Sequence, residues 1–151
     1  MRPDGEYVRI GAMASGDALG CYARMLARVA DRWGVVADGV PPRQKVLPLG
    51  EISRTYADRM LVIGDAAGLV KPTTGGGIHY SILSGGLAAD VAADALARDR
   101  CDAEFLSAYE KAWRGQLGDE LDTQQALRNV VTRLSDAEID SLFDLAQTDG
   151  I

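Results

Sequence analysis

One stretch of the sequence, Leu61–Gly77, constrains the fold of this chain more than any other: LVIGDAAGLVKPTTGGG. Residues Met60–Gly64 are apolar at consecutive positions, which is the pattern of a strand buried on both faces of a mixed or parallel sheet. A loop of small residues, a proline and three glycines follows. No proline interrupts the residues from Ile78 to about Ala97, so we expect a helix there. The stretch therefore predicts a strand, a glycine-rich loop and a helix, in that order.

The residues before this stretch predict one strand and one helix. Glu6–Met13 alternate in polarity, which indicates a half-buried strand, and we interpret it as the last strand of an antiparallel sheet. Ser15 and Asp17 can cap a helix that runs to about Trp33, where Gly34 is expected to stop it.

Between that helix and the apolar run we expect connections and one short extended piece. Val35–Arg43 contains two adjacent prolines and is predicted to be a loop. Pro48 confines Lys45–Gly50 to the edge or end of a sheet. Ile52–Asp58 is predicted to be a polar connection.

Two further helices are predicted after residue 98. An apolar side chain recurs every fourth residue at Phe105, Tyr109, Trp113 and Leu117. This stripe marks an amphipathic helix, and we expect it to be core, although it is also compatible with one wall of a lipid-binding cavity. The last helix begins at Ser135, where the sequence SDAE supplies a capping box. Its predicted buried residues are Ile139, Leu142, Phe143 and Ala146.

Composition excludes several classes of protein. The chain has 151 residues, of which 47% are hydrophobic and 25% charged, as in a globular domain that can bury a core. The net charge of -6 argues against a nucleic-acid partner, which needs a concentrated basic face. The two cysteines have no metal-binding spacing, and we predict no metal site. Neither a signal peptide nor a membrane span is recognisable, so we expect a cytoplasmic protein or one peripheral at the membrane surface.

The Gly-Asp pair and the glycines predict a ligand site. Asp65 follows a predicted strand, and ligands of open α/β sheets bind beyond the carboxyl ends of the strands. Its carboxylate can accept hydrogen bonds from a hydroxylated ligand such as a ribose or ribityl chain, although a carboxylate here can also only cap a turn. Pro72 stiffens the loop, and Gly75–Gly77 lack the Cβ atoms that would hold a flat ring away. The first turn of the Ile78 helix can hold negative charge or a carbonyl oxygen.

Two other phosphate-binding loops are absent. The chain has no GxxxxGK[ST] motif, and Tyr80 stands where a GxGxxG motif beginning at Gly75 needs its last glycine.

The residues Arg59–Leu96 resemble the second FAD-binding motif of flavoproteins of the para-hydroxybenzoate hydroxylase type. Within that group they are most similar to the geranylgeranyl reductase family, in which GDAAG is followed by a proline and a turn ending in GGI. The matching residues are Gly64, Asp65, Ala66, Ala67, Gly68, Pro72 and Gly75–Ile78. The tail LSDAEIDSLFDLA is similar to the C-terminal helix of that family.

The resemblance implies that FAD is the cofactor. Asp65 would accept a hydrogen bond from the ribityl chain, and Ala66–Gly68 would pass near the pyrophosphate. Pro72–Gly77 would line the isoalloxazine ring, and backbone N–H groups near Gly77 and Ile78 would face its N1–C2=O edge. The implied cofactor contacts are Gly64, Asp65, Ala66, Ala67, Gly68, Pro72, Thr73, Gly75, Gly76, Gly77 and Ile78.

The resemblance also implies the fold class, which is a mixed α/β fragment from the C-terminal part of an FAD/NAD(P)-binding-type fold. Short strands precede a helix-rich second half. We expect one partial domain, in which 1–58 is the end of a substrate sheet with a helix and linker, 59–98 the FAD-binding motif and 99–151 the C-terminal helices. The N-terminal dinucleotide-binding segment of such flavoproteins is missing, so we expect the Met60–Ile63 strand to pair outside this chain, with that segment or by self-association.

The function implied is FAD-dependent reduction of isoprenoid double bonds in a geranylgeranyl-type lipid precursor, with electrons from NAD(P)H or ferredoxin. The alternatives are an FAD monooxygenase, halogenase or quinone-linked dehydrogenase with the same loop, or a truncated module that binds no flavin. No catalytic side chain is named. We expect His79 to be a packed helix-start residue, Tyr80 to be packed and Lys71 to lie at the surface.

Overall fold

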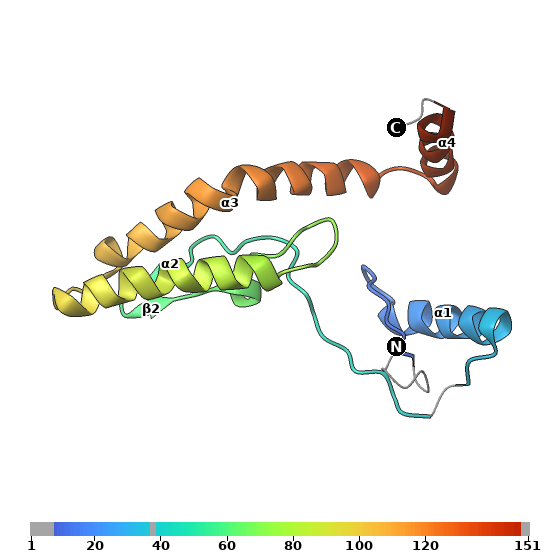
Figure 1. Cartoon of the computed structure of the whole chain (residues 1–151), viewed down its shortest axis with the longest axis horizontal. Helices are drawn as coiled ribbons and strands as arrows, with labels where there is room; N and C mark the ends of the chain where they lie inside the picture. Colours follow the sequence, from blue (N-terminus) through green and yellow to red (C-terminus); the bar gives the residue numbers. More distant parts are fainter. Residues whose placement is uncertain (1–7, 37–38, 149–151) are drawn as a thin grey trace. The chain divides into compact units, whose positions relative to one another are not determined.

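The computed structural model describes residues 8–36 and 39–148 (Figure 1). Contacts divide the chain into two compact units, with the division between Gln44 and Lys45. The first unit contains one helix, α1, and the second contains the other helices and two short strands.

Helix α1, Ala18–Trp33, confirms the helix predicted in the first unit. The Asp17 side chain accepts a hydrogen bond from the backbone N–H of Gly20 at 2.8 Å and so caps the amino end. Gly34 adopts a left-handed conformation with φ of 64° and ends the helix. Both signals are local in sequence, which is why the helix could be predicted.

The strand predicted over Glu6–Met13 is not found in its described part, residues 8–13, which form no regular element. Its first two residues, Glu6 and Tyr7, lie outside the described residues. A strand requires a neighbouring strand to satisfy its backbone N–H and C=O groups, and none of the described residues pairs with this segment. The alternation in polarity alone was therefore not sufficient to predict a strand.

The second unit contains one hairpin, formed by β1, Tyr56–Ala57, and β2, Met60–Leu61. The two strands are antiparallel, with Tyr56 opposite Leu61 and Ala57 opposite Met60. Arg59 takes a left-handed conformation, with φ of 58°, in the turn between them. The polar connection predicted over Ile52–Asp58 is wrong, because Tyr56 and Ala57 within it form β1. The predicted strand over residues 60–64 is confirmed only for its first two residues.

Helices α2, Ile78–Ala97, and α3, Ala103–Val131, pack side by side in the second unit (Figure 1). Both were predicted, although α3 is longer than its apolar stripe indicated. Asp102 caps α3 by accepting a hydrogen bond from the N–H of Phe105 at 3.0 Å. A short 3-10 helix, η1 (Gly64–Ala67), lies between the hairpin and the glycine-rich loop and contacts α2.

The core of the second unit lies where α2, α3 and the hairpin meet. Tyr109 and Trp113 are fully buried and Phe105 is half-buried, so the predicted stripe is core. Polar atoms of the buried rings are paired: Trp113 Nε1 donates to Thr55 Oγ1 at 2.9 Å, and the Tyr109 hydroxyl donates to the Val62 carbonyl at 3.0 Å. These two hydrogen bonds fix the hairpin against α3.

Helix α4, Asp136–Thr148, begins with the predicted capping box. The Glu138 carboxylate accepts from the backbone N–H of Ser135 at 2.8 Å, and the Ser135 hydroxyl accepts from the N–H of Glu138 at 3.4 Å. The predicted burial is wrong, because Leu142 is 54% and Phe143 67% exposed. Amphipathic spacing defines an apolar face but not the element that covers it, and the described core ends at Leu121.

Candidate functional site

Asp65 lies in η1, directly after the hairpin, and its side chain is exposed. The preceding residue, Gly64, is buried with φ of 54°, and its N–H donates to Ser84 Oγ on α2 at 3.1 Å. A Cβ atom at Gly64 would lie 2.5 Å from Ser81 Oγ. Only glycine allows η1 to approach α2 this closely, and the approach brings Asp65 to the amino end of α2.

The Asp65 carboxylate lies against Gly77, the residue before α2. A Cβ atom built on Gly77 would be 2.5 Å from Asp65 Oδ1 and 2.9 Å from Val70 Cγ1. Within the residues that the structure describes, the carboxylate has no hydrogen bond or ion pair of its own. The two features that the sequence predicted to share one site, the acid and the bare backbone, are thus adjacent.

The amino end of α2 offers backbone donors. Gly77 is the N-cap and has no side chain that could accept from the first turn. The Gly77 carbonyl accepts from Ser81 at 2.8 Å, so the helical hydrogen bonds begin there. The N–H groups of the first turn, beginning at Ile78, therefore have no partner within the helix and carry its partial positive charge.

We call Lys71–Gly77 the glycine loop. It is closed by backbone hydrogen bonds: the N–H of Lys71 donates to the Gly76 carbonyl at 2.9 Å, and the N–H of Gly75 donates to the Lys71 carbonyl at 2.8 Å. Gly75 has φ of 73°. Gly76 is exposed, and a Cβ atom there would meet only Thr74 Oγ1, at 3.5 Å. The loop therefore presents bare main chain at its surface.

The other residues predicted to contact the cofactor fall into two groups, those at the surface and those that are buried. Ala66 and Ile78 are exposed and Thr73 is half-buried. Four members are buried: Gly64, Ala67, Gly68 and Pro72. A Cβ atom at Gly68, which has φ of 72°, would overlap the Gly50 carbonyl oxygen. These four residues pack beneath the surface of the site. The sequence alone could not distinguish them from the exposed residues.

Tyr80 is packed, as predicted, and its partners lie on α3. Its hydroxyl donates to the Glu120 carboxylate and accepts from Gln124 Nε2 at 3.1 Å. Burial, together with the neighbouring Glu120 carboxylate, raises the pKa of Tyr80 to about 12. Lys71 is half-exposed, with its Nζ 4.0 Å from Glu120 Oε1. Sequence reasoning missed Glu120 because nothing local links residues forty positions apart.

His79 was expected to be packed and is exposed. It lies in the first turn of α2, where its ring centroid is 5.9 Å from that of Tyr80. The neighbouring position 80 is the one that faces the core, and residues adjacent in a helix do not share a face.

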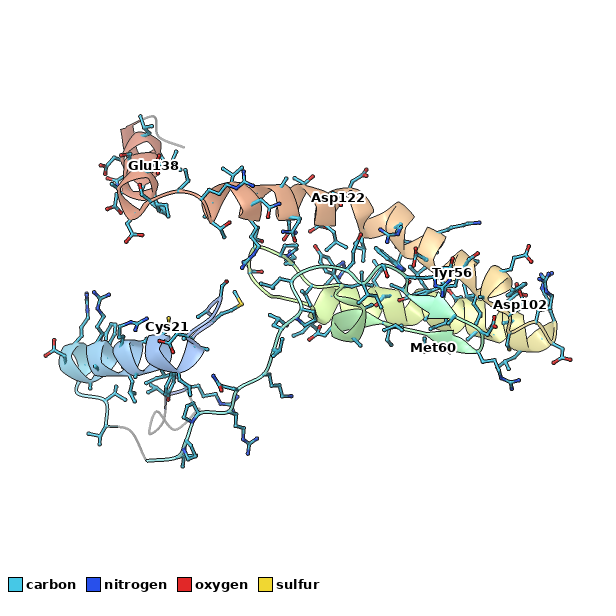
Figure 2. All side chains as sticks on the ribbon, turned by 180° about the vertical axis from the view of Figure 1, so that it is seen from behind. Cys21, Tyr56, Met60, Asp102, Asp122 and Glu138 are labelled. Carbon is cyan, nitrogen blue, oxygen red and sulfur yellow. The ribbon has the colours of Figure 1, made fainter. Side chains whose placement is uncertain are left out.

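A hollow of about 220 Å³ lies in the second unit, and Asp65 is not among the residues that line it. Gly68, Pro72 and Asp122 are among the residues that line it. Figure 2 labels Asp122 on α3, with Tyr56 and Met60 on the hairpin. Ligand pockets of drug-sized molecules have volumes of about 300–1,000 Å³. The hollow is therefore too small for a flavin and is distinct from the surface at Asp65.

The described residues contain neither a metal-binding cluster nor a helix that could span a membrane. No group of three or more His, Cys, Asp and Glu side chains is arranged to hold a metal ion. No helix in residues 8–36 or 39–148 has both the length and the apolar character needed to cross a bilayer.

Known proteins are similar to this chain over most of its length. Residues 8–145 match the family model described as lycopene cyclase protein. Digeranylgeranylglycerophospholipid reductase 2 of Methanothermobacter thermautotrophicus is 45% identical over 94 residues, which are 62% of this chain and 24% of the relative. The digeranylgeranylglycerophospholipid reductase of Methanothrix thermoacetophila is 33% identical and matches 99% of this chain and 39% of its own length. The chain thus spans about a quarter to two fifths of these curated enzymes.

A solved structure has the same fold. The crystal structure of a geranylgeranyl bacteriochlorophyll reductase-like protein from Thermoplasma acidophilum superposes with a TM-score of 0.68. It is 24% identical and covers 87% of this chain, which corresponds to 33% of that protein. The predicted resemblance to geranylgeranyl reductases is confirmed by these relatives. The fold prediction is confirmed in its coarser form, a helix-rich chain with two short strands.

Proposed function

This chain belongs to the family described as lycopene cyclase protein, and from this premise we propose that it is part of an FAD-dependent oxidoreductase. The reaction proposed is the reduction of isoprenoid double bonds in a geranylgeranyl-type lipid precursor. The names of the curated relatives, which are digeranylgeranylglycerophospholipid reductases, support this substrate class over the hydroxylation or halogenation that other flavoproteins with the same loop perform.

The observation that carries the proposal is the contact between Asp65 and Gly77. The carboxylate is exposed, and the Gly77 Cα lies so close to it that any side chain at position 77 would displace it. Beside it are the bare main chain of Gly76 and the uncapped first turn of α2. A carboxylate acceptor next to backbone donors and a flat glycine surface fits the middle of a flavin, which has ribityl hydroxyls on one side and a carbonyl edge on the other.

The residues of this chain would hold and orient the cofactor. Asp65 would accept hydrogen bonds from the ribityl hydroxyls, and Gly75–Gly77 would line the ring. N–H groups at Gly77 and Ile78 would hold the N1–C2=O edge, where the helix end stabilises negative charge by about 1 kcal/mol. FAD, when bound, supplies the transfer of hydride equivalents. The buried members, Gly64, Ala67, Gly68 and Pro72, would set the backbone on which these contacts depend.

We propose further partners on the same basis. Electrons would come from NAD(P)H or ferredoxin, and the substrate would be an isoprenoid lipid. A dinucleotide-binding segment outside these residues, or a second copy of the chain, would complete the sheet at the hairpin. We place the protein in the cytoplasm or peripherally at the membrane surface, where a lipid substrate is accessible.

The test is an anaerobic reduction assay with a geranylgeranyl glycerophospholipid, FAD and dithionite. The protein is prepared as this chain and as any longer product encoded in the same frame, each beside its Asp65→Ala variant. Mass spectrometry should show saturation of the prenyl chains without oxygen, and Asp65→Ala should lower the rate at limiting FAD. Oxygen-dependent hydroxylation of the lipid, with no saturation under anaerobic conditions, would contradict the proposed reaction.

A further inference from the structure

Three polar side chains of α3 reach the same segment of the glycine loop. Glu120, Gln124 and Arg128 are spaced four residues apart, so they lie along one face of the helix. Each of them contacts a residue between Lys71 and Thr73. The contacts join positions about fifty residues apart in the sequence.

Gln124 is the central member. Its Oε1 accepts a hydrogen bond from the Thr73 hydroxyl at 2.8 Å. Its Nε2 donates to the Tyr80 hydroxyl at 3.1 Å and to Glu120 Oε1 at 2.9 Å. One half-buried amide therefore links the glycine loop, the first turn of α2 and the preceding turn of α3. A carboxylate at position 124 could not do this because it only accepts, and a hydroxyl could not because it has a single hydrogen to donate, whereas the amide accepts at its oxygen and donates twice from its nitrogen.

The other two members hold the two residues that precede Thr73, Lys71 and Pro72. Arg128 donates from a guanidinium nitrogen to the Pro72 carbonyl at 3.1 Å, and Pro72 itself is buried. Glu120 accepts from the Tyr80 hydroxyl and lies 4.0 Å from Lys71 Nζ. The ion pair is half-exposed and contributes little, so the hydrogen bonds made by Gln124 and Arg128 are the main restraint.

The glycines themselves favour a mobile loop. Gly75, Gly76 and Gly77 lose more backbone entropy on ordering than any other residue type would. Within the loop they are restrained by main-chain hydrogen bonds, such as that from Lys71 to the Gly76 carbonyl, and by a long one from the Gly76 N–H to Thr74 Oγ1 at 3.4 Å. Fixing Pro72 and Thr73 to α3 orders the start of the loop, and α2 orders its end. The bare main chain is thereby held beside Asp65.

We propose that Gln124 and Arg128, supported by Glu120, are positioning residues that hold the glycine loop in the conformation the cofactor site requires. The inference rests on the proposed function for the identity of the ligand, FAD. The role in ordering the loop does not depend on it, because all the contacts lie within the chain. Neither side chain is assigned a contact with the cofactor.

Amide hydrogen exchange tests the ordering of the loop without any ligand. In Gln124→Leu and Arg128→Met, the amides of Lys71 and Gly75 should exchange about tenfold faster, as expected when a hydrogen bond of ordinary strength is lost. The matched controls are Gln125→Leu and Arg133→Met. Among the described residues, the Gln125 side chain forms a hydrogen bond only with Asn129, on its own helix. In both controls the two amides should exchange as in the wild type. Arg128→Lys keeps a donor and should restore most of the protection.

Binding of FAD, followed by quenching of flavin fluorescence, is measured on the same variants. Weaker binding in Gln124→Leu than in Gln125→Leu, with faster exchange confined to the loop, supports the inference. If the Lys71 and Gly75 amides exchange faster in the variants but neither the wild type nor any variant binds FAD, the positioning role is supported and the proposed function is contradicted. Unchanged exchange at Lys71 and Gly75, or exchange raised equally throughout α2 and α3, would overturn the inference.

Discussion

At the scale of single residues, the glycines of the motif have different structural roles. Gly77 and Gly76 leave main chain bare beside Asp65, whereas Gly64 and Gly68 allow two backbones to pack. The sequence predicted bare main chain at Gly75–Gly77, because these residues lack Cβ atoms. It could not show which glycines of the motif pack against other backbone, since the packing partner of Gly68 is Gly50, in a segment with no motif.

Gly68→Ala should destabilise the chain more than any other glycine substitution in the site. The new Cβ would overlap the Gly50 carbonyl, and φ of 72° is unfavourable for any L side chain. We expect a loss of about 3 kcal/mol or more in the free energy of unfolding, measured by urea denaturation. The control is Gly86→Ala in α2, where a Cβ would meet nothing within 4 Å. That variant should be as stable as the wild type or more stable by up to ~1 kcal/mol, and equal stabilities of the two variants would refute the packing role of Gly68.

At the scale of elements, the helices and β2 were predictable from the sequence, and β1 was not. Caps and apolar spacing are local signals, and they predicted α1, α3 and the start of α4, while the absence of proline after the glycines predicted α2. The strand β1 depends instead on α3: Thr55, just before it, is fully buried and bonded to Trp113 and Glu110. No local pattern around Thr55 could indicate that its partner is Glu110, fifty-five residues away.

Glu110 holds this hairpin and should make its stability depend on pH. The carboxylate accepts from the Thr55 N–H at 2.7 Å and from the Thr55 hydroxyl at 3.0 Å, and Arg114 is 3.4 Å away. Burial acts to raise the pKa of Glu110, but these hydrogen bonds outweigh it and the pKa is lowered below the usual 4.5. A lowered folded-state pKa stabilises the fold above the unfolded-state pKa, and that stability is lost as the pH falls through the folded-state value.

Glu110→Gln should therefore lower the free energy of unfolding by about 1–2 kcal/mol at neutral pH. This difference between the two proteins should shrink as the pH falls below 4.5, because the wild-type carboxylate then becomes protonated. Urea denaturation of both proteins at neutral and acidic pH measures the difference. Glu104→Gln, at an exposed position on the same helix, is the control and should change stability by less than ~0.5 kcal/mol at either pH. A cost for Glu110→Gln that stays constant across this range would exclude the ionised carboxylate as its source.

At the scale of the whole molecule, the sequence predicted that the Met60–Ile63 strand pairs with a segment outside this chain. Helix α2 is apolar around most of its circumference, and its outward side chains Ile78, Ile82 and Leu96 are 81%, 72% and 73% exposed. A helix that is hydrophobic all round is normally buried. Pairing of the hairpin region with a segment outside these residues, or with a second copy, stays a prediction. It agrees with a chain that spans only part of the length of its relatives.

The central claim is that Asp65 and the main chain at Gly77 together bind a flavin, and an equilibrium titration with FAD tests it most directly. Flavin fluorescence is followed for the wild type, Asp65→Ala and the control Asp90→Ala, which removes an exposed carboxylate from α2. Loss of a charged hydrogen-bond acceptor costs about 1.5–3 kcal/mol, so the Kd of Asp65→Ala should rise roughly 10- to 150-fold, while that of Asp90→Ala stays as in the wild type. Equal FAD affinity in all three proteins, or no binding by any of them, would contradict the claim.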